Sequence, residues 1–412
     1  MLRFLTAGES HGKGLVAIVD GVPAGLAIDV DAITIDLRRR QTGYGRGRRM
    51  VIESDRAEPL SGVRHGVSSG GPIALLIPNK DWENWQRTMY VEAEMPPGAS
   101  GVDRPPVTRP RPGHADLAGF VKYGHEDMRN VLERASARET AARVAVGAIA
   151  RQLLATVSAE IVSHVIAIGP AALPDPSAIS FAQARAIQAD APLHCADPAV
   201  EQRMIAEINR ARDAGDTMGG SFEVIAHGVP AGLGSYVQWD RKLDGRLAQA
   251  MMSIPAIKAV GIGMGPQVAY VPGSRVHDEI VPGGSGAPTG IRRPTNNAGG
   301  LEGGVTNGED VRVTGYMKPI STLMTPLRSV DLTTMTESPA TVERSDVCAV
   351  PAAAVVGEAM VAFVLADALV EKFGGDSIEE LLTSFEAFMN RTSARFSKER
   401  KGSRGREERK ER

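Results

Sequence analysis

GVPAGL, the stretch at residues 21–26, occurs again letter for letter at residues 228–233, half a chain further on. Two further pairs keep the same order at a separation of about 210 residues: SGVRHGV (61–67) with GSRVHDE (273–279), and LERASARETAARVAVGAIARQLL (132–154) with VERSDVCAVPAAAVVGEAMVAFVL (342–365). One short Gly-Pro match is compatible with chance, but three matches in the same order are much less so. We therefore expect two similar halves from an internal duplication, roughly 1–160 and 215–375, joined by a more variable middle.

The pattern around these repeats predicts an α+β fold. LVAIVDG (15–21) and FEVIAHG (222–228) are typical of strands that end in Gly-Pro turns. Helices are expected at 31–41, 137–155, 197–215, 351–373 and 376–390. Because the chain lacks the long Val/Ile runs of a doubly wound parallel sheet, we expect antiparallel sheets packed on core helices.

Composition narrows the class of protein. The 412 residues carry a formal net charge of −2, and only 4% are aromatic. Cys195 and Cys348 form no CxxC pair, which disfavours a disulfide framework or a thiolate metal site. We therefore expect no metal and a reducing, cytoplasmic environment. Residues 1–392 are expected to form a single catalytic domain, and the highly charged segment 393–412 a disordered tail.

Neither the N-terminal residues nor the most apolar segment of the chain predicts a membrane protein. The N-terminal residues contain no apolar stretch long enough for a signal peptide. The most apolar segment, 347–370, is interrupted by Pro351, Glu358 and Asp367, so it is expected to be a buried core helix.

Positive charge is concentrated in RRRQTGYGRGRRM (38–50), which holds six arginines. A nucleic-acid binder usually shows a basic balance over its whole domain, whereas this chain is slightly acidic. The local charge therefore favours a pocket for a phosphorylated small molecule. Arg38, Arg39 and Arg48 are compatible with solvated positions or with subunit contacts.

Several loops carry residues suited to acid–base or anion chemistry. GESHGKG (8–14) fails the P-loop pattern and leaves His11 between glycines, while RPRPGHADLAGF (109–120) presents His114 on a stiff loop. An exposed turn or a structural loop is an equally open interpretation of each. Arg134 and Arg138 flank a predicted helix start, where cations are disfavoured unless an anion binds. Asp346 is compatible with a helix cap or with a tuned base.

Together these segments resemble chorismate synthase, over roughly nine-tenths of the chain. The matching stretches are TAGESHG, RRRQTGYGRGRRMVIESD, SGVRHGVSSGGPIALLIPNKDW, TRPRPGHADLAGFVKYG, VLERASARETAARVAVG, TNNAGGLEGGVTNG, MKPIST and RSDVCAVPAAAVVGEAM. The resemblance implies a carbon–oxygen lyase that converts 5-enolpyruvylshikimate 3-phosphate to chorismate by a 1,4-anti elimination of phosphate. This is a step of the shikimate pathway, in aromatic amino acid biosynthesis, and it needs reduced FMN without net redox change. It also implies a homotetramer with a β-α-β sandwich fold.

The resemblance also implies roles for individual residues. His11 matches the acid that serves the departing phosphate, His114 the group that protonates the reduced flavin near N1, and Asp346 the partner of flavin N5 in removing the ring proton. The FMN site would comprise Arg134, Ala135, Ser136, Pro255, Ala256, Gly303, Lys318, Pro319, Ile320, Ser321, Thr322 and Arg344. The substrate site would comprise Ser10, Arg40, Arg46, Arg49, Arg111 and Arg138. Arg40 and Arg46 also match positions for NADPH.

Two rival functions remain open on the sequence alone. A nucleic-acid-binding protein would use the arginine run and the charged tail, and it would show strongly salt-dependent binding. A flavin-dependent oxidoreductase would consume NADPH in stoichiometry with a reduced product. We expect no nucleic-acid or membrane partner, and we expect FMN to be reduced by an external flavin reductase rather than by NADPH on this chain.

Overall fold

The computed structural model describes residues 1–47, 54–283, 290–343 and 346–396. Its N-terminal part forms a four-stranded antiparallel sheet in the order β1-β2-β6-β3. The strands are β1 (Arg3–Ala7), β2 (Gly14–Asp20), β3 (Glu58–Pro59) and β6 (Ile73–Pro78). β2 confirms the strand predicted from LVAIVDG, and its alternate side chains Leu15, Ala17 and Val19 are buried in the core.

A second antiparallel sheet follows in the order β10-β15-β9-β7-β8. Its strands are β7 (Glu160–Ile168), β8 (Ala171–Ala172), β9 (Gly220–His227), β10 (Ile257–Ile262) and β15 (Val311–Met317). β9 confirms the strand predicted from FEVIAHG. Val224 of β9 packs in the main core, whereas Ile225 packs under helix α7 (Phe181–Arg185), so both faces of this strand are covered.

The two sheets share one plan. In each, the four main strands lie side by side as first, second, fourth and third in chain order. GVPAGL follows the second strand in both cases, and Gly21 and Gly228 have φ angles of +87° and +72°. A Cβ on either would lie 2.3 Å or 2.6 Å from a carbonyl oxygen, of Met1 or Ser158 respectively. The repeated letters therefore form the same glycine-dependent turn, while a common origin of the halves stays a prediction.

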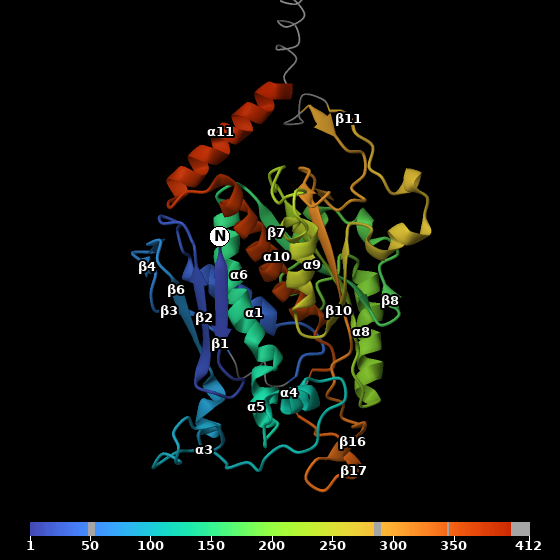
Figure 1. Cartoon of the computed structure of the whole chain (residues 1–412). Coiled ribbons are helices and arrows are strands. Elements are labelled where there is room, and N and C mark those ends of the chain that lie inside the picture. The colour runs from blue at the N-terminus through green and yellow to red at the C-terminus, as the bar shows by residue number, and fades with distance from the viewer. Residues whose placement is uncertain (48–53, 284–289, 344–345, 397–412) are drawn as a thin grey trace, which may run out of the picture.

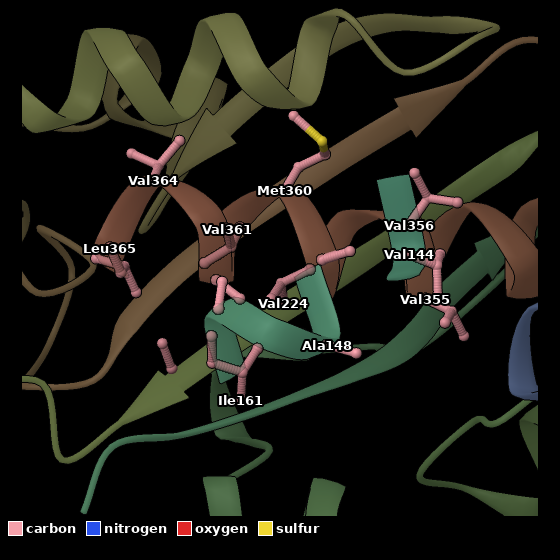
Figure 2. Close-up of a cluster of buried hydrophobic side chains, with 14 of the residues drawn as sticks. Val144, Ala148, Ile161, Val224, Val355, Val356, Met360, Val361, Val364 and Leu365 are labelled. Atoms are coloured by element: carbon pink, nitrogen blue, oxygen red, sulfur yellow. The ribbon is translucent and has the colours of Figure 1, made fainter. Parts of the chain in front are cut away.

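Helices separate the two sheets and form the core. Between the sheets lie α1 (Val30–Gln41), α6 (Thr140–Ala155) and α10 (Val350–Phe373), with α9 (Leu243–Met252) packed on α10 and β10 (Figure 1). Figure 2 shows side chains of α10, α6 and the second sheet meeting in one buried cluster, among them Val361, Ala148 and Ile161. The predicted α+β class and β-α-β sandwich are thereby confirmed.

The two longest core helices touch at a glycine. A Cβ on Gly147 of α6 would lie 2.2 Å from the Cβ of Ala359 on α10, so the helices approach too closely for any side chain there. α10 is long and apolar enough to cross a membrane, but 89% of its most apolar window is buried inside the fold. The prediction of a core helix for this segment is confirmed.

The other predicted helices are also present. A 3₁₀ turn at Ala137–Glu139 leads into α6, and the remaining two are α8 (Pro198–Asp213) and α11 (Ile378–Phe396). α11 extends beyond its predicted end, so residues 393–396 are helical rather than part of a tail, and 397–412 lie outside the described residues. The smaller elements are α3 (Gln86–Met89), α4 (Asp116–Tyr123), α5 (Arg129–Arg134), β4 (Val63–Arg64), β5 (Val67–Ser68), β11 (Val281–Pro282), β12 (Ile291–Arg292), β13 (Leu301–Glu302), β14 (Val305–Thr306), β16 (Arg328–Asp331) and β17 (Thr336–Pro339).

Candidate functional site

The candidate residues surround the end of the sandwich where α6 and α10 begin, the lower end in Figure 1. Arg138 immediately precedes α6, and Asp346 lies just before α10. Helix N-termini carry partial positive charge and unpaired backbone N–H groups. This end of the fold is therefore suited to an anionic ligand even before its arginines are considered.

Two buried arginines share one buried carboxylate here. Arg40 Nη2 lies 3.2 Å and Arg138 Nη1 2.5 Å from Oδ2 of Asp55, and none of the three side chains is more than 4% exposed. Among the described residues, no group accepts a hydrogen bond from the buried Nε of Arg40. Burial lowers the pKa of Arg40 to about 10, opposed by Asp55 and assisted by the charges of Arg138 and Arg46. A bound anion would supply an acceptor for this nitrogen.

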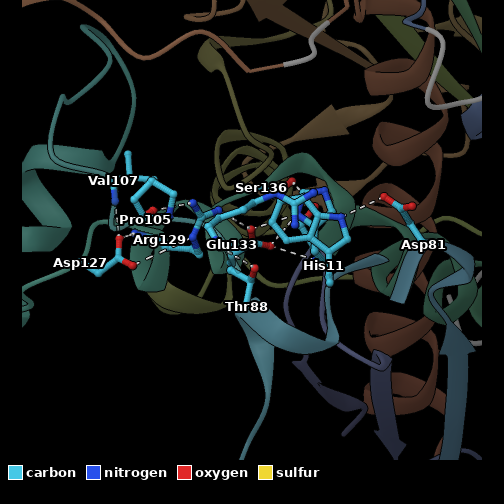
Figure 3. Close-up of polar contacts among 12 residues, drawn as sticks. His11, Asp81, Thr88, Pro105, Val107, Asp127, Arg129, Glu133 and Ser136 are labelled. Carbon is cyan, nitrogen blue, oxygen red and sulfur yellow. Dashed lines mark hydrogen bonds and ion pairs between the residues drawn. The ribbon is translucent and has the colours of Figure 1, made fainter. Parts of the chain in front are cut away.

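His11 lies in the loop between β1 and β2, where two neighbours fix its orientation. Its Nδ1 lies 2.9 Å from both carboxylate oxygens of Glu133, and its ring stacks on Trp85 with centroids 3.7 Å apart (Figure 3). Ser10 is buried beside it, and the hydroxyl of Ser136 donates to the hydroxyl of Ser10 over 3.2 Å. The predicted acid, the predicted substrate serine and a predicted flavin residue are thus neighbours.

Asn79 joins the His11 loop to the arginine cluster. Its Nδ2 donates to the carbonyl oxygens of Glu9 and Gly12, at 3.1 and 2.8 Å. Its Oδ1 accepts a hydrogen bond from Nε of Arg138 at 3.0 Å. The side chain is buried, so these three hydrogen bonds are shielded from water.

His114 belongs to a second charged group on the loop before α4. Its Nδ1 lies 2.5 Å from Oδ1 of Asp116, and Arg111 binds the same carboxylate through Nε and Nη2. Burial favours the neutral carboxyl, but the hydrogen bonds from His114 and Arg111 outweigh it and hold the pKa of Asp116 well below its ordinary value. Arg111 also donates to the hydroxyl of Thr322 over 3.1 Å, which links this loop to a predicted flavin segment.

The predicted base is paired with a predicted substrate arginine. Nη1 of Arg46 donates to Oδ2 of Asp346 over 2.6 Å, and the backbone N–H of Gly47 donates to Oδ1 over the same distance. Both side chains are largely buried. Asp346 therefore serves here as an anchor for the turn that follows α1, rather than as a simple cap of α10.

Two of the predicted flavin segments meet after α9. The backbone N–H of Lys318 donates to the carbonyl of Ala256 over 2.9 Å, and Ala256 has a φ angle of +67° that side-chain-bearing residues rarely adopt. Nζ of Lys318 donates to the carbonyl of Gly113, beside His114. Burial, together with the charge of Lys258, lowers the pKa of Lys318.

A chain of side-chain contacts connects the remaining flavin segment to these two. Arg134 donates to Thr6, whose hydroxyl donates to Glu139 over 3.0 Å. Glu139 pairs with Arg143, which donates to the carbonyl and hydroxyl of Ser253, just before the predicted Pro255 and Ala256. The predicted residues Arg134, Ala135 and Ser136 therefore lie on the side of the fold that faces the end of α9.

Gly303 does not join this group within the chain. It lies in the turn between β13 and β14, and the neighbouring Gly304 accepts a hydrogen bond from the N–H of Leu243, the first residue of α9. The other flavin segments lie at the last residues of the same helix, which is about 15 Å long. Arg49 and Arg344 lie outside the described residues.

In the described part of the arginine run, Arg38 to Arg46, the charges do not form a continuous basic surface. Arg39 binds both oxygens of Glu358, in the middle of α10, at 2.7 Å. The expectation that Arg39 is merely solvated is therefore wrong, because a carboxylate buried inside a core helix requires a cationic partner. A role of Arg39 in subunit contacts stays a prediction. Since Arg39, Arg40 and Arg46 all pair with carboxylates of this chain, nothing in this part of the run favours nucleic acid.

Sequence reasoning missed the residues that hold the predicted ones in place. They are Asp55, Asn79, Trp85, Asp116 and Glu133. All lie inside or beside the stretches that resemble the family, but no spacing rule pairs them with their partners. Among the described residues there is no group of three side chains suited to bind a metal.

Comparison with known proteins agrees with this geometry. The family model described as chorismate synthase matches residues 2–370. The chorismate synthase of Desulforudis audaxviator is 56% identical over 394 residues, which is 96% of this chain and 99% of that protein. That of Moorella thermoacetica is 56% identical over 392 residues, 94% of this chain and 99% of that protein. A solved chorismate synthase structure superposes with a TM-score of 0.76 at 43% identity, covering 95% of this chain and 98% of that one. The chain belongs to the chorismate synthase family.

Proposed function

We propose that this chain catalyses the elimination of phosphate from 5-enolpyruvylshikimate 3-phosphate to give chorismate. Family membership makes it a carbon–oxygen lyase of the shikimate pathway that acts on a small molecule. The observation that carries the proposal for this site is that Arg40 and Arg138 are buried side by side on Asp55, and that Nε of Arg40 has no hydrogen-bond partner among the described residues.

The charge of the substrate suits this pair. A phosphate and two carboxylates carry about four negative charges near neutral pH. Burying that charge without partners would be prohibitive, and guanidinium groups bind both phosphate and carboxylate through two parallel hydrogen bonds. Two helix N-termini at the same end of the fold add to the attraction.

Family membership also implies dependence on a reduced flavin, and we propose FMN. The donor set at this end of the fold fits a phosphorylated cofactor: Arg134 and Lys318 are cationic, and Ser136, Ser321 and Thr322 carry hydroxyl groups. These residues, with Ala135, Pro255, Ala256, Pro319 and Ile320, would hold it. When bound, the reduced flavin supplies electron density to the allylic system of the substrate.

Three residues of this chain would donate, hold or remove the protons of the reaction. His11 would deliver a proton to the phosphate as its C–O bond breaks, which is the step that most needs charge neutralised. His114, held by Asp116 and Arg111, would keep a proton next to the flavin. Asp346 would take part in removing the ring proton after Arg46 turns from it to the anionic substrate.

Other features of the family are proposed for this chain without support from its geometry. They are assembly as a homotetramer, a cytoplasmic location, and reduction of FMN by an external reductase rather than by NADPH bound at Arg40 and Arg46. Gly303 lies far from the other flavin residues of the same chain, so its predicted role in flavin binding is proposed only within such an assembly.

Anaerobic turnover tests the proposal. The purified protein, photoreduced FMN and substrate should release phosphate and form chorismate in equal amounts, whereas oxidised FMN should support no turnover. The same assay with NADPH in place of light separates self-reduction from dependence on a reductase. No turnover with flavin that is demonstrably bound and reduced would refute the function. His11→Ala and Asp346→Ala should each lower kcat by at least about 100-fold with little change in KM.

A further inference from the structure

Glu133, near the end of α5, makes three contacts with the loop that carries His11. Its carboxylate accepts hydrogen bonds from the backbone N–H of His11 over 2.9 Å and lies the same distance from His11 Nδ1. Its own carbonyl oxygen accepts the N–H of Ser10 over 3.1 Å. The side chain is fully buried, whereas that of His11 is 14% exposed. The carboxylate therefore lies on the buried side of the histidine, and Figure 3 shows the contacts between the two residues.

Trp85 fixes the plane of the imidazole. The two rings stack at an interplanar angle of 17°, and the indole N–H donates to Asp81 over 3.0 Å. The guanidinium of Arg104 lies 3.7 Å from the centroid of the same indole, and that of Arg129 lies 5.6 Å from it. With the ring held on its face and at one nitrogen, His11 cannot turn its other nitrogen toward Glu133 without breaking the stack.

Among the charged groups around His11, the carboxylate of Glu133 is the one that contacts the imidazole. Nη1 of Arg129, one helical turn before Glu133, lies 3.9 Å from the Glu133 carboxylate. On the other side, Ser136 and the arginine Arg138 face the loop through Ser10 and Asn79. Glu133 is thus the carboxylate in direct contact with the ring, whereas Asp81 contacts the indole of Trp85 and not the imidazole.

A carboxylate can only accept hydrogen bonds, so the nitrogen that faces it must carry the proton. In the neutral imidazole, Nδ1 is then protonated and Nε2 has a free lone pair. Nε2 makes no hydrogen bond in the part of the chain that the structure describes. It is therefore the nitrogen available to a ligand.

We propose that Glu133 is a positioning residue for His11, which fixes its Nδ1–H tautomer and presents Nε2 as the nitrogen that exchanges protons with the phosphate of the substrate. The proposal rests on the proposed role of His11 as the acid. In the elimination the C–O bond breaks and its electron pair goes to the phosphate oxygen. The proton on Nε2 of the imidazolium moves to the phosphate, while Nδ1–H stays bound to Glu133. The buried carboxylate also balances the imidazolium charge among the arginines.

Glu133→Gln tests this with an almost unchanged shape. The backbone N–H of His11 can only donate, so the amide oxygen must take the place of Oε2. The amide NH₂ then takes the place of Oε1, 2.9 Å from Nδ1, and it too can only donate. Because Nδ1 lies 2.9 Å from both positions, it can accept a hydrogen bond from this NH₂ or keep its proton and donate to the amide oxygen. The variant should therefore no longer hold the ring in a single tautomer.

The tautomer is read by magic-angle-spinning NMR of protein labelled with ¹⁵N-histidine, and the His11 signals are assigned by their loss in His11→Gln. We expect Nδ1–H alone in the wild type and a mixture of Nδ1–H and Nε2–H in Glu133→Gln. We also expect kcat to fall about 100-fold in the variant, with KM and FMN affinity changed less than about twofold. Nε2–H in the wild type, the same tautomer populations in both proteins, or an unchanged kcat would each overturn the proposal.

Two further variants separate positioning from folding. Glu133→Asp keeps the charge and should keep Nδ1–H, so it also provides the test if Glu133→Gln does not fold; Nε2–H in this variant would contradict the proposal. His227 is stacked on Phe181 and lies 2.6 Å from Asp310, a similar arrangement on another surface. Asp310→Asn should leave kcat unchanged. Because the tautomer is read without substrate, it is independent of whether the wild type forms chorismate.

Discussion

Replacing Asp55 with Asn should destabilise the ligand-free protein through charge alone. The Asp55 side chain is 2% exposed, and its carboxylate is shared by Arg40 and Arg138. Asn has nearly the same volume and can still accept a hydrogen bond, so the substitution creates no cavity. What it removes is the negative charge between two buried guanidinium groups.

The magnitude follows from the two contacts. A pair of opposite charges about 4 Å apart is worth about 4 kcal/mol at an effective dielectric constant of 20. Removing one partner of a buried ion pair typically costs about 3–5 kcal/mol, since the other charge stays buried. Because the two arginines would then repel each other, we expect a loss of about 4 kcal/mol in the free energy of unfolding.

Urea denaturation at pH 7 and low salt measures this loss, followed by tryptophan fluorescence in the wild type and in Asp55→Asn. Asp36→Asn is the matched control, because Asp36 is also shared by two arginines, Arg39 and Arg151, which both keep Glu358. The control should lose no more than about 1 kcal/mol.

An anionic ligand should partly replace the missing charge. Saturating substrate should therefore raise the unfolding midpoint of Asp55→Asn by more than that of the wild type, since the ligand binds only the folded protein. Equal stability of Asp55→Asn and the wild type, or equal losses in Asp55→Asn and the control, would refute the reasoning that these two arginines depend on Asp55.

Three further changes have definite expected outcomes. Gly147→Ala should destabilise the protein by about 1–3 kcal/mol in urea denaturation, despite the better helix propensity of alanine, because its Cβ would lie 2.2 Å from that of Ala359. The pKa of Glu358 is lowered to about 2, because Arg39 and its neighbours outweigh the effect of burial. The stability that this ionised carboxylate contributes is present above pH 4.5 and is lost as the pH falls toward 2. The wild type should therefore be more stable than Glu358→Gln by about 3 kcal/mol at pH 7, and acid-unfolding measurements should show this difference shrinking over that range. Lys318→Met should weaken FMN binding at least about fivefold in a fluorescence titration, because it removes a cation and hydrogen-bond donor; unchanged affinity would remove this residue from the flavin site.

Local sequence signals predicted the helices well. The side chain of Asp29, just before α1, accepts hydrogen bonds from the N–H groups of Asp31 and Ala32, as an N-cap should. Asp197 caps the first turn of α8 in the same way. Ser136 caps the turn before α6, although its oxygen accepts from the N–H of Arg138 and not from the third position of a capping box. These capping interactions join residues only a few positions apart, so they can be predicted from the amino-acid sequence alone.

Local signals of this kind could not predict which charged residues pair in the site. Glu133 lies 122 positions from His11, and Asp346 lies 300 positions from Arg46. Nothing in the spacing of either pair distinguishes it from other acidic residues of the chain. Each pair forms because the strands and helices that carry its two members pack at the same end of the sandwich.

By itself, the sequence determined the α+β class, the positions of the core helices, the repeated turn after the second strand of each half, and the residue types available for anion and acid–base chemistry. Those features depend on periodicity, capping and glycine geometry, which are local. Only the tertiary structure decided that Arg40 and Arg138 share Asp55, that Arg39 binds Glu358, and that His11 lies between Glu133 and Trp85. A buried charge must find its partner among groups brought together by packing, and that choice is made by the fold as a whole.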